Sequence, residues 1–347
     1  MKKNCHVTLN QKSFPARCGD VLLDAALANG VDLPHDCRSG ICGACRVRLV
    51  KGRVFGGQNE DDEMVHACQA RVISDIEIET ERVPDQVSTT GRVAAIVRLS
   101  PDVFGVDIEL PQPFHYLPGQ FCKVQFFGFP GRNYSPTYPL EGRPRKNLMH
   151  FHIRKFPDGL VSSELGGAIR VGHRVRVSGP FGHAFHRPDH AGGIVLVSSG
   201  TGFAPMWSVA VAAIMERPKR ELIFVVAARK LHSLYMHAAL CRLALFPNVT
   251  IIPTVSELQN VSSAIRSGRP TDHLPNLSPN DLVYVSGAPA MTAQVARMAK
   301  AAGARCFTDP FVPNATPSGQ NTLVRSLGRF ALSPGRAFSG LTARLAG

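Results

Sequence analysis

The C-terminal half of the chain alternates strand patterns with helical ones. Apolar runs of strand length begin at Gly193 and recur at residues 222–228, 249–253 and 282–286. Segments with helical patterns separate them at residues 205–215 and 290–301. Runs that are apolar throughout indicate strands covered on both faces, and repetition of strand and helix is typical of a parallel doubly wound α/β sheet. Such a sheet binds its ligand at the carboxyl ends of its strands.

A denser pattern of short strands fills the middle of the chain. Pro and Gly closely punctuate the strand-like segments, which are residues 92–99, 106–110, 121–127, 148–154 and 174–178. Many short strands with turn residues between them favour an antiparallel β-barrel.

The first 83 residues predict a small sheet crossed by one helix. Residues 5–10, 46–50 and 76–79 alternate apolar and polar positions as strands do, and residues 14–18 form the return strand of a hairpin. Residues 21–28 predict a helix, capped by the preceding Gly19-Asp20 and ended by Asn29-Gly30. The whole is an α+β multidomain chain. We expect domains at residues 1–83, 91–190 and 191–312, with a linker at 84–90 and a tail at 313–347.

Length and charge agree with several domains. A chain of 347 residues is long enough for two or three separate cores. Its net charge is +13, but residues 1–83 hold 11 Lys and Arg against 12 Asp and Glu, so the remainder carries +14. The basic residues are scattered without aromatic interleaving, so we expect no nucleic acid partner.

The ends of the chain carry weaker signals. The tail beyond Asp309 has no acidic residue, and residues 322–330 place apolar residues at helical spacing. A disordered tail is the main interpretation, and docking to a membrane surface or a partner is the alternative. No apolar run approaches the ~20 residues of a transmembrane helix, and no apolar signal segment follows Met1, so we expect a cytoplasmic protein.

Four of the nine cysteines stand at a spacing that suits a metal cluster. Cys37, Cys42 and Cys45 share one short loop, and Cys68 follows after 22 residues. This C-x4-C-x2-C…C arrangement is the one that holds a 2Fe-2S cluster. The small residues between the cysteines allow backbone N–H groups to approach the sulfides. A structural zinc site or unligated thiols are the alternatives, but zinc sites usually show two C-x2-C pairs and only one is present here.

Three stretches of the predicted barrel carry candidate chemistry. They are Leu117-Pro-Gly-Gln120, Arg132-Asn-Tyr-Ser135 and Gly159-Leu-Val-Ser162. Taken singly, each also fits a structural role, as a solvated charge, a rim aromatic or a turn glycine. The predicted α/β sheet has two further stretches, Gly200-Thr-Gly-Phe-Ala-Pro205 and Ser286-Gly-Ala-Pro-Ala-Met291.

In their order, these motifs resemble two known families. Cys37-Arg-x-Gly-x-Cys-Gly-x-Cys45 resembles the cluster loop of plant-type ferredoxins, which have the β-grasp fold. Arg132-x-Tyr-Ser135, Gly159-x-x-Ser162, Gly200-Thr-Gly-x-Ala-Pro205 and Ser286-Gly287 resemble the flavin and nicotinamide motifs of ferredoxin reductases. Asp309-Pro-Phe311 resembles the closing motif of the same family.

For the flavin, the resemblance implies an FAD site on the barrel. Arg132 would face the FAD phosphate, Tyr134 would pack on the flavin, and Ser135 would hydrogen-bond near its N5. Gly159 and the backbone N–H groups of Val161 and Ser162 would hold the pyrophosphate at the start of a helix at residues 162–165. The resemblance also sets Phe311 near the flavin, although a core phenylalanine after a turn is nearly as good an interpretation.

For the nicotinamide nucleotide, the resemblance implies a site on the α/β sheet. Gly200, Thr201 and Gly202 would admit the pyrophosphate, with Pro205 in the following helix, and Gly287 would adjoin the nicotinamide. Ser286 stands where relatives usually have cysteine, so hydride transfer would be slower. Arg229-Lys230 fits a 2′-phosphate of NADP, but relatives that use NADH also have arginine there, so NADH is the expected coenzyme and NADPH remains open.

The order of the motifs resembles the reductase component of bacterial multicomponent oxygenases. The resemblance implies electron transport from NADH through FAD and the 2Fe-2S cluster to a terminal oxygenase component or its ferredoxin. A Rieske ring-hydroxylating oxygenase of aromatic hydrocarbon catabolism is the expected acceptor. Di-iron monooxygenases and deoxysugar dehydratases are alternative acceptors, and a redox sensor without turnover is an alternative from another functional class.

Overall fold

The computed structural model describes residues 4–10, 12–31, 33, 35, 38–40, 45–57, 64–80, 83–140, 144–257 and 264–312. Residues up to Val312 form one compact unit. Cys37, Cys42 and the predicted tail lie outside the described residues. No helix of the described residues is long and apolar enough to cross a membrane.

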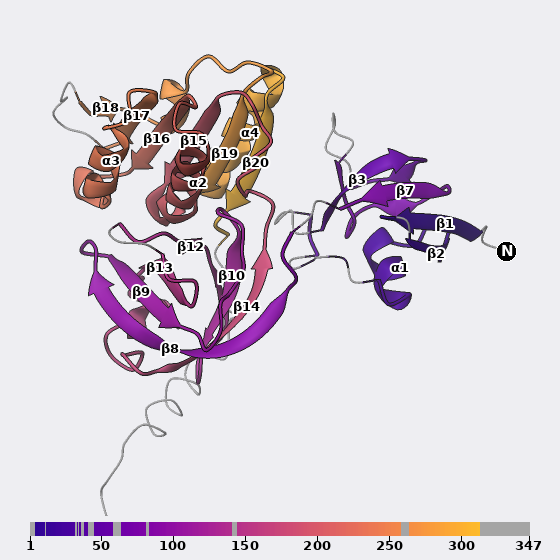
Figure 1. The fold of residues 1–347 in the computed structure, drawn as a ribbon, viewed down its shortest axis with the longest axis horizontal. Helices are drawn as coiled ribbons and strands as arrows, with labels where there is room; N and C mark the ends of the chain where they lie inside the picture. The colour runs from indigo at the N-terminus through magenta and orange to yellow at the C-terminus, as the bar shows by residue number, and fades with distance from the viewer. Residues whose placement is uncertain are drawn as a thin grey trace, which may run out of the picture. The chain divides into compact units, whose positions relative to one another are not determined.

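The N-terminal module is the small sheet with one helix that the sequence predicts (Figure 1). Its strand order is β2-β1-β7-β3-β5, with one short additional pair, β4 and β6. The strands are β1 (Asn4–Leu9), β2 (Lys12–Arg17), β3 (Arg46–Lys51), β4 (Val54–Phe55), β5 (Met64–His66), β6 (Arg71–Val72) and β7 (Ile76–Glu79).

Helix α1 (Leu22–Ala28) begins differently from the prediction. Its N-cap is Val21, which makes no side-chain capping bond. The carboxylate of Asp20 instead accepts the backbone N–H of Arg17 at 3.0 Å and so closes the preceding turn. The expected Gly19-Asp20 cap was therefore wrong, whereas the helix ends at Asn29 and Gly30 as predicted.

The middle module is a seven-stranded antiparallel, barrel-like sheet of order β11-β10-β14-β8-β9-β13-β12. Its strands are β8 (Val87–Arg98), β9 (Val103–Glu109), β10 (Phe121–Phe126), β11 (Arg132–Tyr134), β12 (Pro136–Thr137), β13 (Leu148–Arg154) and β14 (Arg174–Phe181). Strand β8 begins at Val87, so residues 87–90 of the predicted linker belong to this sheet.

The C-terminal module is a parallel sheet of order β18-β17-β16-β15-β19-β20. Its strands are β15 (Ile194–Ser199), β16 (Leu222–Ala228), β17 (Val249–Val255), β18 (Arg266–Ser267), β19 (Leu282–Gly287) and β20 (Arg305–Pro310). The helices are α2 (Phe203–Glu216), α3 (His237–Leu243) and α4 (Pro289–Ala301).

Helices cover both faces of this parallel sheet (Figure 1). Alternate residues of β15 point to opposite faces: Leu196 packs in one core with α2 and α3, and Val197 packs in the other with α4. Because both faces are covered, β15, β16 and β19 are apolar almost throughout, which is the pattern from which the sequence predicted them.

Side-chain hydrogen bonds join the barrel to helix α2. Thr137 Oγ1 donates to the carbonyl of Ala204 at 2.8 Å, and Ser208 Oγ donates to the carbonyl of Pro136 at 3.2 Å. Trp207 Nε1 donates to the carbonyl of Tyr138 at 3.1 Å. The segment that follows Ser135 is therefore the part of the barrel that α2 holds.

Candidate functional site

Ser135 lies where the two edges of the barrel sheet are joined. It separates β11, one edge strand, from β12, the other. Its side chain is buried, whereas Arg132 and Tyr134 of β11 are half-buried. Burial raises the pKa of Tyr134 to about 12, and the nearby Arg132 cation opposes the rise. A guanidinium beside an aromatic ring fits a flavin nucleotide, which presents phosphates and a planar ring.

Asp309 brings the two predicted catalytic serines together. Ser135 Oγ donates to Asp309 Oδ2 at 3.3 Å, and Ser286 Oγ donates to the same oxygen at 3.2 Å. Ser286 on β19 is directly opposite Asp309 on β20 in the parallel register. The barrel thus contributes one hydroxyl, and the parallel sheet contributes the other hydroxyl and the carboxylate.

The carboxyl of Asp309 has an unusual proton affinity. Burial raises its pKa to about 6, although the hydrogen bonds from Ser286 and Ser135 oppose the rise. Asp309 takes part in none of the ion pairs among the described residues. A carboxyl in this state can hold or release a proton near neutral pH.

The loops after β15 and β19 approach each other with almost no space between their backbones. A Cβ atom on Gly202 would lie 2.3 Å from the carbonyl oxygen of Ser286. A Cβ on Gly287, whose φ is +127°, would lie 2.4 Å from Ser199 Oγ. Both glycines are therefore required for packing, which fixes Ser286 beside the start of α2.

Gly200 is the glycine that faces open space. Its φ is +55°, and no heavy atom lies within 4 Å of the position that its Cβ would occupy. This fits a close approach of a nucleotide pyrophosphate to the backbone. Thr201 is half-buried in the same turn, and Pro205 is buried in the first turn of α2, where proline is tolerated.

A small hollow of about 10 Å³ lies beyond the carboxyl ends of β15 and β16. Gly200, Val226, Ala227 and Tyr235 are among its lining residues. This is the edge at which parallel sheets bind nucleotides.

The loop predicted to hold the flavin pyrophosphate is tightly folded. Residues 162–164 form a single 3₁₀ turn in place of the longer helix expected at 162–165. Ser162 Oγ accepts the N–H of Phe156 at 3.1 Å, and a Cβ on Gly159 would lie 2.4 Å from that oxygen. Val161 is buried. Gly159 and the Ser162 hydroxyl thus shape the loop. Only the backbone N–H groups of this loop then remain for contact with a phosphate.

The remaining barrel stretch, Leu117 to Gln120, is a structural turn. Gln120 Oε1 accepts the N–H of Leu117 at 2.7 Å. Gly119 has φ +105°, and a Cβ there would lie 2.1 Å from the carbonyl oxygen of Ala184.

Phe311 lies half-buried just after β20. Its N–H donates to the carbonyl of Gly287 at 2.7 Å, and this bond holds Phe311 next to the Ser286 loop.

Of the four predicted cluster ligands, the structure describes Cys45 and Cys68. Both are buried, 3% and 8% exposed. The N–H of Ala67 bonds the carbonyl of Cys45 at 2.9 Å, so the two ligand segments run side by side. Arg38, with φ +53°, and Gly40, with φ +75°, make tight turns in the intervening loop. Buried thiols beside such a loop fit a 2Fe-2S cluster.

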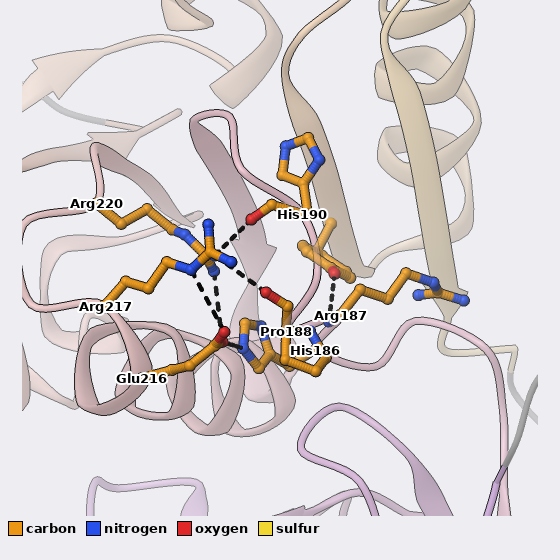
Figure 2. Close-up of polar contacts among 8 residues, drawn as sticks. His186, Arg187, Pro188, His190, Glu216, Arg217 and Arg220 are labelled. Atoms are coloured by element: carbon orange, nitrogen blue, oxygen red, sulfur yellow. Dashed lines mark hydrogen bonds and ion pairs between the residues drawn. The ribbon is translucent and has the colours of Figure 1, made fainter.

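A second polar network links the barrel's exit segment to the end of α2 (Figure 2). His186 Nε2 lies 2.7 Å from Glu216 Oε2, and Arg220 Nη1 lies 3.8 Å from the same oxygen. Arg220 Nη2 also donates to the carbonyls of Pro188 and His190, at 3.4 and 2.5 Å. Burial lowers the pKa of His186, while Glu216 opposes that change. The network anchors the connecting segment.

Sequence reasoning missed the central residue of the site. Asp309 stood in the recognised Asp309-Pro-Phe311 motif, but only Phe311 was assigned a role. The network of Glu216, His186 and Arg220 gave no local signal, because its members lie far apart in sequence and meet only through packing.

Comparison with known proteins assigns the three modules. Residues 6–72 match the 2Fe-2S iron-sulfur cluster binding domain, residues 90–186 the oxidoreductase FAD-binding domain, and residues 196–297 the oxidoreductase NAD-binding domain. The predicted fold class and the three cofactors, 2Fe-2S, FAD and NAD(H), are thereby confirmed.

Whole-chain relatives share this arrangement. A reductase component of the naphthalene 1,2-dioxygenase/salicylate 5-hydroxylase systems of Ralstonia sp. is 33% identical over 80% of this chain and 88% of its own. The naphthalene 1,2-dioxygenase reductase component of Pseudomonas putida is 29% identical over 88% and 97%. The crystal structure of the Amycolatopsis cytochrome P450 reductase GcoB superimposes with a TM-score of 0.65 and 27% identity, covering 90% of this chain and all of that one.

The three domain matches follow one another along the chain in the order of the modules that hold the site residues described above. This protein is an oxidoreductase with 2Fe-2S, FAD and NAD domains, and it therefore belongs to the family of ferredoxin–NAD(P)⁺ reductase components of oxygenase systems.

Proposed function

We propose that this protein passes electrons from NADH through FAD and its 2Fe-2S cluster to a Rieske ring-hydroxylating oxygenase or its ferredoxin. The observation that carries the proposal is the meeting of Ser135, Asp309 and Ser286, because it joins the flavin barrel to the nicotinamide sheet at hydrogen-bonding distance. FAD bound at the barrel would supply the chemistry that links a two-electron hydride donor to a one-electron cluster.

In this proposal the chain's own residues position the reactants. Arg132 and Tyr134 hold the flavin at the barrel edge, and Gly200 admits the nucleotide at the sheet edge. Asp309 keeps the hydroxyls of Ser135 and Ser286 turned toward one oxygen, and its carboxyl supplies a proton-holding group. Phe311 lies beside the Ser286 loop. Cys37, Cys42, Cys45 and Cys68 ligate the cluster.

The choice of NADH is supported by an ion pair at the sheet edge. Arg229 Nε lies 3.4 Å from Glu257 Oε1, and the N–H of Glu257 bonds the carbonyl of Arg229 at 2.9 Å. The exposed carboxylate competes with a 2′-phosphate for this arginine. Replacing Glu257 by Gln should raise kcat/KM for NADPH several-fold and leave that for NADH nearly unchanged. An unchanged ratio of the two would contradict the NADH assignment.

The Rieske acceptor is supported by the naphthalene dioxygenase relatives and by potentials. A plant-type cluster lies near −400 mV and a Rieske centre at about −150 mV or above, so each electron falls by about 250 mV, or ~6 kcal/mol. We place the protein in the cytoplasm, the reducing compartment that its nine cysteines suit.

Two experiments test the proposal. In stopped-flow mixing with NADH, the flavin absorbance should bleach first and the cluster should be reduced next, whereas a flavin that stays oxidised for minutes would indicate a protein without turnover. Cys68→Ala should abolish cytochrome c reduction and keep ferricyanide reduction through the flavin.

The acceptor is tested separately. The reduced protein is mixed with a Rieske oxygenase, a di-iron hydroxylase or a cytochrome P450, the last because one structural relative is a cytochrome P450 reductase. Reduction of the Rieske centre alone is the expected result. Reduction of one of the others alone would replace the acceptor and leave the electron path intact.

A further inference from the structure

The side chain of Gln69 lies across the cluster loop and the fourth cluster ligand. Its Nε2 donates to the carbonyl of Arg38 at 2.8 Å and to the carbonyl of Cys68 at 3.1 Å. The same nitrogen lies 3.7 Å from Cys68 Sγ, within the range of an N–H···S hydrogen bond. One amide group therefore joins the residue after Cys37 to the thiol of Cys68.

The loop is shaped around this side chain. A Cβ on Gly40 would lie 3.0 Å from Gln69 Cγ, and Gly40 has φ +75°. Arg38 takes φ +53°, a conformation that a residue with a side chain seldom adopts. Two contacts hold it there, the bond from Gln69 to its carbonyl and the ion pair of its guanidinium with Asp24 of α1 at 3.0 Å. Backbone strain of this kind persists only where the surroundings fix it.

We propose that Gln69 is a positioning residue that sets the reduction potential of the 2Fe-2S cluster, by donating an N–H hydrogen bond to the sulfur of Cys68 and fixing the Arg38 turn. Hydrogen bonds to a ligand sulfur stabilise the reduced cluster, whose added negative charge they share. The amide has two hydrogens for three acceptors, so the bond to sulfur is shared with a carbonyl. The proposal rests on the cluster ligands assigned under the proposed function.

The test is a redox titration of the cluster in the holoprotein, with the EPR signal of the reduced cluster as the readout. Gln69→Leu keeps most of the side-chain volume and removes both donors. At a fixed ambient potential near the midpoint, the ratio of reduced to oxidised cluster should fall about threefold to tenfold, where tenfold corresponds to ~59 mV for one electron. Gln69→Glu, with an added negative charge, should lower the ratio further.

Asn29→Leu is the matched control. Asn29 Nδ2 also donates to two backbone carbonyls, those of Pro15 and Ala25, at 3.0 and 2.8 Å, but no sulfur accepts from it. Its removal should destabilise the module without changing the midpoint. A Gln69→Leu midpoint equal to that of the unsubstituted protein would overturn the proposal.

A measurement on the unsubstituted protein covers the case in which Gln69→Leu assembles no cluster. With ¹⁵N in the glutamine side chains, pulsed EPR of the reduced cluster should detect a weak nitrogen coupling, and its absence would also overturn the proposal. If the unsubstituted protein itself has no 2Fe-2S spectrum, the ligand assignment fails instead, so the two failures are distinguishable.

Discussion

Two carboxylates lie where the barrel meets the nicotinamide sheet, and they have opposite surroundings. Glu216, at the end of α2, has the imidazole of His186 at 2.7 Å and the guanidinium of Arg220 at 3.8 Å (Figure 2). Asp309, in β20, accepts hydrogen bonds from the hydroxyls of Ser135 and Ser286. The first is surrounded by basic groups, and the second by neutral donors.

The difference separates a structural site from a chemical one. Glu216 is a partly exposed carboxylate, and its contacts with His186 and Arg220 hold the connecting segment to the end of α2. Asp309 is half-buried with only hydroxyl donors, and desolvation raises its pKa to about 6, so it exchanges a proton in the range where an enzyme works. We therefore predict that Glu216 fixes the connection between the modules and that Asp309 takes part in the reaction.

The largest effect is expected from breaking the Glu216 network. Arg220→Met removes a guanidinium whose side chain is only 2% exposed, and it leaves the carbonyls of Pro188 and His190 without their donor. Leaving buried carbonyl acceptors without a donor costs about 1–3 kcal/mol. The free energy of unfolding in urea should fall by that amount.

Arg217→Met is the matched control, because Arg217 contacts the same carboxylate at 3.5 Å from a side chain that is 43% exposed. An exposed ion pair contributes less than about 1 kcal/mol, so this variant should unfold almost as the unsubstituted protein does. Equal losses in both variants would show that Glu216 is not an anchor.

The second prediction concerns the other carboxylate. Asp309→Asn keeps the shape of the side chain and removes its negative charge and its exchangeable carboxyl proton. If Asp309 serves hydride transfer, flavin reduction by NADH should slow by about 10²-fold, the lower end of what a positioned acid–base group contributes. Rapid-mixing absorbance of the flavin measures the rate.

Asp107→Asn tests whether another half-buried carboxylate of the barrel would have the same effect. Asp107 Oδ1 lies 2.7 Å from His150 Nδ1 within the barrel sheet and contacts none of the three site residues by hydrogen bond. It should leave the flavin rate within about twofold. A slow Asp107→Asn variant with a fast Asp309→Asn variant would reverse the assignment.

The third prediction is the pH dependence of stability. The folded pKa of Asp309, about 6, is above its ordinary value of 3.8. Its favourable contribution is therefore fully present below pH 3.8 and is lost as pH rises through about 6. Between pH 5 and 7.5 the unsubstituted protein should lose about 1 kcal/mol more than Asp309→Asn. Parallel pH curves from urea unfolding would show that the carboxyl is not buried in this way.

The parts that the sequence could predict are those encoded locally. Residues 222–228 form β16 with the predicted ends, because an apolar run bounded by polar residues determines a buried strand. Ser135 and Ser286 were singled out by short motifs. Asp309 also stood in a short motif but was given no role, because that role comes from the register that pairs it with Ser286 across two strands.

The structure adds a packing role to some residues that the motifs singled out for binding. Gly202 is predicted to bind the coenzyme, and its missing side chain also makes room for the carbonyl of Ser286. Pro136 and Thr137, which follow the serine of the predicted flavin motif, both bond α2. A motif indicates where the backbone is constrained, whereas the neighbour that causes the constraint depends on tertiary packing.

The smallest expected effect comes from removing one of Asp309's two donors. Ser286→Ala deletes a hydroxyl whose hydrogen bond lowers the pKa of Asp309, so that pKa should rise, by less than about one unit for one hydrogen bond. The inflection in the pH profile of flavin reduction should move upward accordingly, with a rate loss of less than about tenfold. Ser208→Ala is the control, since Ser208 Oγ bonds the Pro136 carbonyl at 3.2 Å in the same interface without touching Asp309. Ser208→Ala should leave the inflection in place. If the inflection shifts in Ser208→Ala as well, loosened packing between the modules causes the shift. If it shifts only in Ser286→Ala, the changed pKa of the Asp309 carboxyl causes the shift.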